Sequence, residues 1–218
     1  VFRLYPAFLV AIAIAALLAL LGPGWVPESV SEQPATSMLA HLTMLHEVIG
    51  AENLQHQFWT LAYEMVFYLV VAGLFVWGMH RHSAVWAGAL AVAGLAGWPD
   101  GLPSADRRVL AAGLAAAAAG GVAGFVTGRG VRAAGLAGIG FVLLVAVNGH
   151  PTALSTVASS AQGLLLLAVM FAGTVVYRTE HGGLDRRLAV PALLMVGLCL
   201  TTTVSWPTTA AVAGTFAA

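Results

Sequence analysis

The sequence contains very few charged residues and no lysine. Only 8% of the 218 residues are charged, whereas 60% are hydrophobic, and the net charge is zero. All nine basic residues are arginines. So few positive charges exclude the basic surface on which nucleic-acid binding depends. Several apolar runs approach the roughly 20 residues that cross a bilayer, so the composition predicts a polytopic α-helical membrane protein in contact with lipid.

Cysteine and the common catalytic motifs are also scarce. The one cysteine, Cys199, lies in an apolar run, which excludes an internal disulfide and favours a small core side chain. The sequence has no glycine-rich phosphate loop, no HExxH motif and no GxSxG motif. His41 and His46 are poorly spaced for two metal ligands on one helix, so we predict no metal site.

Hydrophobic runs predict an all-α bundle with about seven membrane spans, forming a single domain over residues 1–218. The expected spans cover residues 4–21, 58–79, 85–98, 109–127, 133–147, 157–177 and 188–204. In the span at 109–127, Gly120, Gly121 and Gly124 are expected to let a neighbouring helix approach closely.

Residues 37–49 have a different pattern. Apolar residues recur at helical spacing with polar residues between them: Met38, His41, Leu42, Leu45, His46, Glu47 and Ile49. This pattern predicts one short amphipathic helix that lies on the membrane interface or plugs a cavity, with interfacial histidines. Among the histidines, His56, close to the mouth of the next span, is the candidate for a functional role.

The arginines predict an orientation in the membrane. If the chain starts in the cytoplasm and successive spans alternate, every arginine except Arg107 and Arg108 falls on the cytoplasmic side. This distribution is the one expected from the positive-inside rule. The loop at 22–57, with its short amphipathic helix, is then extracytoplasmic.

A carboxylate interrupts the second predicted span. Glu64 is the only charged residue in the run 58–79, and a charge near the bilayer centre costs at least about 2.5–3.5 kcal/mol on insertion scales. Thr60, Glu64 and Tyr68 are four residues apart and therefore share one helical face. We expect this face to line a polar pocket rather than to meet lipid. The alternative is a carboxylate that only joins neighbouring helices through hydrogen bonds.

Two stretches together resemble acyltransferase family 3, the integral-membrane enzymes that O-acylate bacterial envelope sugars and some secondary metabolites. Residues 2–7 (Phe-Arg-Leu-Tyr-Pro-Ala) are similar to the end of its Arg-Arg-x-x-Arg-x-x-Pro signature. Residues 59–68 (Trp-Thr-Leu-Ala-Tyr-Glu-Met-Val-Phe-Tyr) are similar to its Trp-Ser-Leu-x-x-Glu-x-x-Phe-Tyr element. The segments 42–45 and 170–173 fit the family pattern more loosely.

The resemblance implies transfer of a small acyl group, often acetyl from acetyl-CoA, to a hydroxyl of a sugar or similar acceptor. It implies a bacterial plasma membrane location and no permanently bound cofactor, because acyl-CoA is consumed as the donor. Glu64 would support the catalytic base or bind the sugar. Substrate-binding roles are implied for Arg3, Tyr5, His56, Trp59 and Tyr68.

The family's catalytic Arg–His pair lies on a first helix that has no counterpart here. We therefore expect a partial chain whose base lies upstream of Val1 and which does not catalyse acyl transfer alone. Two alternatives remain. The first is a transporter, because the short spans at 85–98 and 133–147 are typical of the broken helices of transporters. The second is a non-catalytic membrane fragment.

Overall fold

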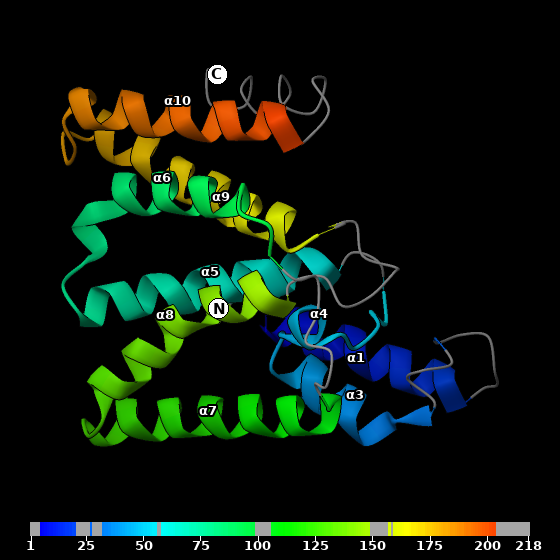
Figure 1. The fold of residues 1–218 in the computed structure, drawn as a ribbon. Coiled ribbons are helices and arrows are strands. Elements are labelled where there is room, and N and C mark those ends of the chain that lie inside the picture. The colour runs from blue at the N-terminus through cyan, green and yellow to red at the C-terminus, as the bar shows by residue number, and fades with distance from the viewer. Residues whose placement is uncertain are drawn as a thin grey trace.

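The computed structural model describes residues 5–20, 27, 32–55, 58–98, 106–148, 157 and 159–203. Within these residues the chain is all-α and contains no strand, which confirms the predicted fold class (Figure 1). The helices, with one 3₁₀ turn η1, are α1 (Tyr5–Leu20), α3 (Pro34–Leu42), α4 (His46–Ile49), α5 (Phe58–Val76), η1 (His80–His82), α6 (Ser83–Gly94), α7 (Arg107–Thr127), α8 (Val131–Asn148), α9 (Ser160–Glu180) and α10 (Arg186–Thr203).

Five of the described helices, α5, α7, α8, α9 and α10, are long and apolar enough to cross a membrane. This supports a multi-pass membrane protein. The predicted number of about seven spans is not confirmed. The expected spans at 4–21 and 85–98 form helices of only 16 and 12 residues, which are shorter than a full crossing normally needs.

The long helices lie side by side, with α10 at one edge and α7 at the other (Figure 1). α6 and α9 pack together beneath α10, and α5 and α8 pack together in the middle. The short helices α3 and α4 gather with α1 at one end of this array, where α5 begins and α8 ends (Figure 1). That end contains the most deeply buried polar side chains.

Glycines let α5 and α8 approach closely. A Cβ atom on Gly138 would lie 2.5 Å from the carbonyl oxygen of Leu69, and one on Gly135 would lie 2.9 Å from the Cβ of Val76. A Cβ on Gly73 would collide with the carbonyl oxygen of Gly135. Small residues serve this purpose in membrane proteins because helix association there depends on close packing.

The glycines of α7 do not have the predicted role. No atom outside its own helix lies within 4 Å of a Cβ built on Gly120, and the nearest to one on Gly121 is 4.0 Å away. Gly124 approaches the carbonyl oxygen of Arg129, just past the end of its own helix. The expectation was wrong because α7 is largely exposed at the edge of the array. The interpretation of Cys199 as a small core side chain is confirmed, since it is buried.

Hydrogen bonds tie the helix connections together at the end opposite α4. The guanidinium of Arg178, near the end of α9, donates to the carbonyl of Arg81 (2.6 Å) and to the hydroxyl of Ser83 (2.9 Å). The indole N–H of Trp77, past the end of α5, donates to the carbonyl of Arg132 at the start of α8 (3.1 Å). We call this the arginine-rich end.

The arrangement of the helices separates the arginines from η1 to α10 as the predicted orientation requires, but it does not place the start of α1 on the same side as the arginine-rich end. The Tyr5 hydroxyl, at the start of α1, donates to the carbonyl of Leu42 at the end of α3, so α1 begins at the end of the array where α3 and α4 lie (Figure 1). The start of α7, with Arg107 and Arg108, lies at the opposite end of the array (Figure 1). Arg3 is outside the described residues. The arginine-rich end carries Arg81, Arg129, Arg132, Arg178, Arg186 and Arg187.

We expect Gly138→Ala to lower the thermal midpoint of unfolding, because the added methyl group meets the Leu69 carbonyl. Overpacking of this kind costs about 1–3 kcal/mol. The matched control is Gly140→Ala on the same helix, where a Cβ has no neighbour within 4 Å. The two variants would be compared by thermal melting in lipid nanodiscs. Equal effects of the two substitutions would contradict the close approach of α5 and α8.

We expect the arginine-rich end to be cytoplasmic. In a Cys199→Ala background, an impermeant thiol reagent should label Gln33→Cys in intact cells, because Gln33 is exposed before α3. It should label Arg81→Cys only after the membrane is permeabilised. The reverse labelling pattern would invert the orientation.

Candidate functional site

The face of α5 that carries Glu64 is turned toward the outside of the described helices. Thr60 is exposed, Glu64 is half-buried and the Tyr68 side chain is 39% exposed. Among the described residues, none forms a hydrogen bond or ion pair with Glu64. The expectation that this face lines a polar pocket is therefore not confirmed by the described part of the chain.

The other predicted substrate-binding residues are dispersed. The Tyr5 hydroxyl donates to the carbonyl of Leu42 (2.7 Å), which ties the start of α1 to the end of α3. Trp59 is half-buried, and its ring meets that of Tyr63 edge-on at 6.3 Å. Arg3 and His56 are outside the described residues.

The structure instead buries polar side chains that the sequence placed at the membrane interface. His41, His46 and Glu47 are each 0% exposed. The prediction of one interfacial helix over 37–49 is wrong, because the helix breaks. α3 ends at Leu42, Met44 takes a left-handed backbone conformation (φ 56°), and α4 begins at His46.

This break turns α4 into the protein interior. The Met44 N–H donates to the carbonyl of His41 (2.8 Å), and Gly50 ends α4 in a left-handed conformation (φ 78°) that glycine adopts without steric cost. From the end of α8, the side-chain amide of Asn148 donates to the carbonyl of Val48 (2.7 Å). The short helix is thus held by the end of a spanning helix.

Four aromatic rings, one each from α1, α3, α4 and α5, meet at this point. The rings of His41 and His46 stack with centroids 4.3 Å apart and planes 3° apart. Phe58 meets both imidazoles edge-on at 6.3 Å, and Phe8 lies nearly parallel to His46 at 6.5 Å. The faces of the His46 ring are therefore covered by other rings.

The two histidines differ in their hydrogen bonding. Nδ1 of His41 lies 2.8 Å from the carbonyl oxygen of Ser37, so Nδ1 carries the proton and donates it. The backbone N–H of Leu54 donates to Nε2 of His41 (3.3 Å), which fixes a neutral tautomer. Neither ring nitrogen of His46 has a hydrogen-bond partner among the described residues.

Next to His46 lies a buried carboxylate whose hydrogen bonding is incomplete. The side-chain amide of Asn53 donates to Oε2 of Glu47 (2.7 Å), whereas Oε1 of Glu47 and Oδ1 of Asn53 have no partner in the described part of the chain. Glu47 is also within electrostatic reach of Tyr63 on α5. We call His46, Glu47 and Asn53 the buried polar site.

The buried polar site is the strongest candidate for function. A buried polar group without a partner costs about 1–3 kcal/mol, so native proteins rarely keep one without a reason. Here four such atoms lie on three side chains. The described residues contain no group of three or more His, Cys, Asp or Glu side chains that would hold a metal ion.

Burial lowers the pKa of both histidines. Loss of hydration, and to a lesser extent the neighbouring His41, lowers the pKa of His46 to about 3. The Asn53 side chain and the Phe58 backbone oppose this shift, although neither makes a well-aligned hydrogen bond with the ring nitrogens. Burial likewise lowers the pKa of His41, against the hydrogen bond to Ser37. Both rings are therefore neutral at neutral pH.

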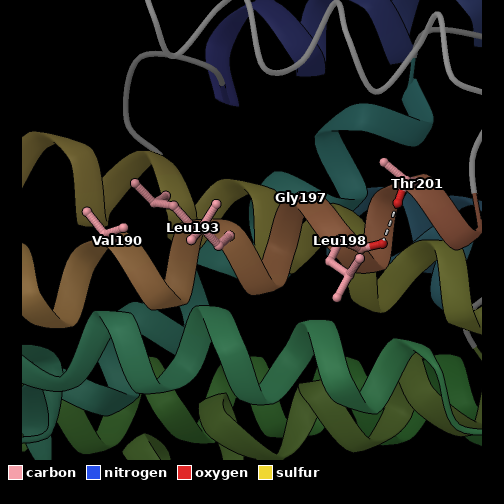
Figure 2. A pocket seen from close by; sticks show the side chains of 6 residues that line it. Val190, Leu193, Gly197, Leu198 and Thr201 are labelled. Atoms are coloured by element: carbon pink, nitrogen blue, oxygen red, sulfur yellow. Dashed lines mark hydrogen bonds between the residues drawn. The ribbon is translucent and has the colours of Figure 1, made fainter.

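An open hollow along α10 offers much less chemistry (Figure 2). Its polar side chain, Thr201, already donates its hydroxyl to the carbonyl of Leu198 (2.7 Å). Such an apolar surface on a single spanning helix suits contact with lipid chains. The lining residues all belong to α10: Val190, Leu193, Leu194, Gly197, Leu198 and Thr201.

Comparison with protein-family models, with curated proteins and with solved structures finds no match to this chain.

We expect the thermal midpoint to fall as the pH drops below about 6.5. The lowered pKa of His46 means that the unfolded chain binds more protons than the folded protein between about pH 6.5 and 3. Acid therefore favours unfolding, by up to about 1.4 kcal/mol per pH unit for each such group. Thermal melting in nanodiscs between about pH 5 and 8 measures this slope.

His46→Leu should flatten that slope, because it removes one group that must become protonated on unfolding. The matched control is His82→Leu, since His82 is exposed. If wild type and His46→Leu lose stability in parallel on acidification, His46 is not buried in its neutral form.

Proposed function

We propose that this chain is part of a membrane-bound O-acyltransferase, which moves a small acyl group from acyl-CoA to a hydroxyl of a sugar or similar acceptor. One observation carries the proposal. Residues 59–68, which resemble the Trp-to-Tyr element of acyltransferase family 3, form part of the spanning helix α5, whose first residue, Phe58, meets the ring of His46 edge-on at 6.3 Å. Tyr63 is buried, and the next residue, Glu64, is half-buried.

The arrangement of charges supports this reaction. The donor, acyl-CoA, is an anionic cytoplasmic molecule, and in the predicted orientation the arginine-rich end meets it on that side. In the transfer, the hydroxyl oxygen forms a bond to the thioester carbonyl carbon and the carbon–sulfur bond breaks. The hydroxyl proton passes through a base to the CoA thiolate, so that free CoA thiol leaves.

The predicted site residues have supporting roles in this proposal. Glu64 would orient the base or bind the sugar, and Tyr68 would donate a hydrogen bond beside it. Arg3, Tyr5, Trp59 and His56 would contact substrate. The proposed location is the bacterial plasma membrane, where such enzymes modify polysaccharides of the cell envelope.

The transporter alternative has less support in the structure than in the sequence. It depended on two short spans that were compared with the broken helices of transporters. The span expected at 133–147 is an uninterrupted helix, α8, which is long enough to cross a membrane. Only α6 remains short, with 12 residues.

We expect Glu64→Gln, in the complete natural protein, to remove most acyl transfer while leaving the thermal midpoint nearly unchanged. Glutamine keeps the shape of the side chain and loses the charge. CoA release from acetyl-CoA in the presence of an acceptor sugar measures the reaction. Tyr68→Phe should have a milder effect, since one neutral hydrogen bond contributes about 0.5–1.5 kcal/mol. Near-normal turnover of Glu64→Gln would show that the carboxylate is only structural.

A further inference from the structure

We propose that His46, Glu47 and Asn53 form a buried binding site for hydroxyl groups, and that the acceptor of the acyl group occupies it. The identity of this occupant rests on the proposed function. The existence of the site rests on the geometry of α4 and its neighbours.

The free atoms of the site match a hydroxyl group better than other polar groups. Oε1 of Glu47 and Oδ1 of Asn53 accept hydrogen bonds, and the orientation of the Asn53 amide is fixed because its nitrogen must donate to the carboxylate. A neutral His46 ring offers one N–H donor and one acceptor nitrogen. A hydroxyl group both donates and accepts, so a molecule with several hydroxyls can satisfy all four atoms.

Other ligand classes fit less well. A phosphate or carboxylate only accepts hydrogen bonds, and the carboxylate of Glu47 would repel it, which excludes the anionic part of acyl-CoA. An ammonium group only donates, which leaves the N–H of His46 without an acceptor. Two chemical sources of hydroxyl groups remain, a carbohydrate acceptor and water, and the experiment must distinguish between them.

His41 shows that simple packing does not explain His46. Both imidazoles are fully buried and stacked on each other. The chain satisfies both nitrogens of His41 with the Ser37 carbonyl and the Leu54 N–H, whereas neither nitrogen of His46 makes a well-aligned hydrogen bond in the described residues, although the Asn53 side chain and the Phe58 backbone lie near that ring. Buried polar atoms normally have hydrogen-bond partners, and His41 follows this rule while its neighbour His46 does not. Such a departure is typical of a functional position.

The position of the site suits an acceptor that arrives from outside the cell. The site lies at the opposite end of the array from the arginine-rich end, among α1, α3, α4 and the start of α5 (Figure 1). In the predicted orientation, that end is extracytoplasmic. Phe58, the first residue of α5, meets the ring of His46, so the site adjoins the helix that carries Glu64.

The test uses ¹⁵N-histidine-labelled protein in nanodiscs. The ring signals of His46 are assigned by their loss in His46→Leu, and the probes are glycerol and the methyl glycosides of glucose, galactose and mannose. We expect at least one probe to shift the His46 signals saturably, with little effect on His82. Glu47→Gln should weaken the response about tenfold or more, since it removes a charge-assisted hydrogen bond.

Three results would overturn the proposal. They are cross-peaks from His46 to water without any response to the probes, a ring that contacts neither water nor probe, and a response to zinc in place of the sugars. A stability comparison provides a second readout. His46→Leu should retain the wild-type thermal midpoint, because it removes an unpaired polar group, whereas His41→Leu should lower it by breaking two hydrogen bonds.

The experiments distinguish failure of the hydroxyl-binding site from failure of the acyltransferase proposal. If a sugar shifts the His46 signals but the complete natural protein releases no CoA, the binding site stands and the acyltransferase proposal fails. If CoA release occurs, His46→Leu should raise the acceptor KM about tenfold or more with a smaller effect on kcat. An unchanged acceptor KM in His46→Leu would overturn the site and leave the acyltransferase intact.

Discussion

Each polar group that enters a membrane-embedded bundle must find a partner inside the protein, and this constraint explains most of the contacts described above. Arg178 uses backbone carbonyls and a serine at the α5–α6 connection, and Asn148 caps the carbonyl of Val48. His41 is satisfied by two backbone groups of its own neighbourhood. Against this background, the four unpartnered atoms of His46, Glu47 and Asn53 stand out as a cluster; the further such atom in the described part of the chain is Nδ1 of His80.

The helices could be predicted from the sequence because their signals are local. α5, α9 and α10 lie close to the spans expected from apolar runs and flanking loops. The two-helix form of residues 34–49 could not be predicted, because it depends on a left-handed methionine and on contacts with distant helices. Positive φ is rare for a methionine, and nothing in the local pattern indicates it. The sequence also does not indicate that Gly73, Gly135 and Gly138 bring α5 and α8 together, because a close approach depends on which two helices pack against each other.

The candidate site was only partly accessible to sequence reasoning. Glu64 is recognisable from the sequence alone, because a charge within an apolar run is unusual. His46 and Glu47 were assigned to the interface because alternating polar and apolar residues usually indicate a half-wetted helix. One feature of the sequence favours burial instead. The residues around His46 and Glu47 are apolar or glycine, and all of them are buried in the structure: Leu45, Val48, Ile49 and Gly50.

The glycine contacts between α5 and α8 also determine where this molecule can deform. They lie in the second half of α5, around Leu69, Gly73 and Val76, and leave no space for the two backbones to slide. That half of α5 is packed closely against α8. The stacked imidazoles of His41 and His46 lie beside the other end of α5, where they meet Phe58. Any adjustment of the bundle would therefore meet less resistance at the start of α5, beside His46, than along the close α5–α8 contact.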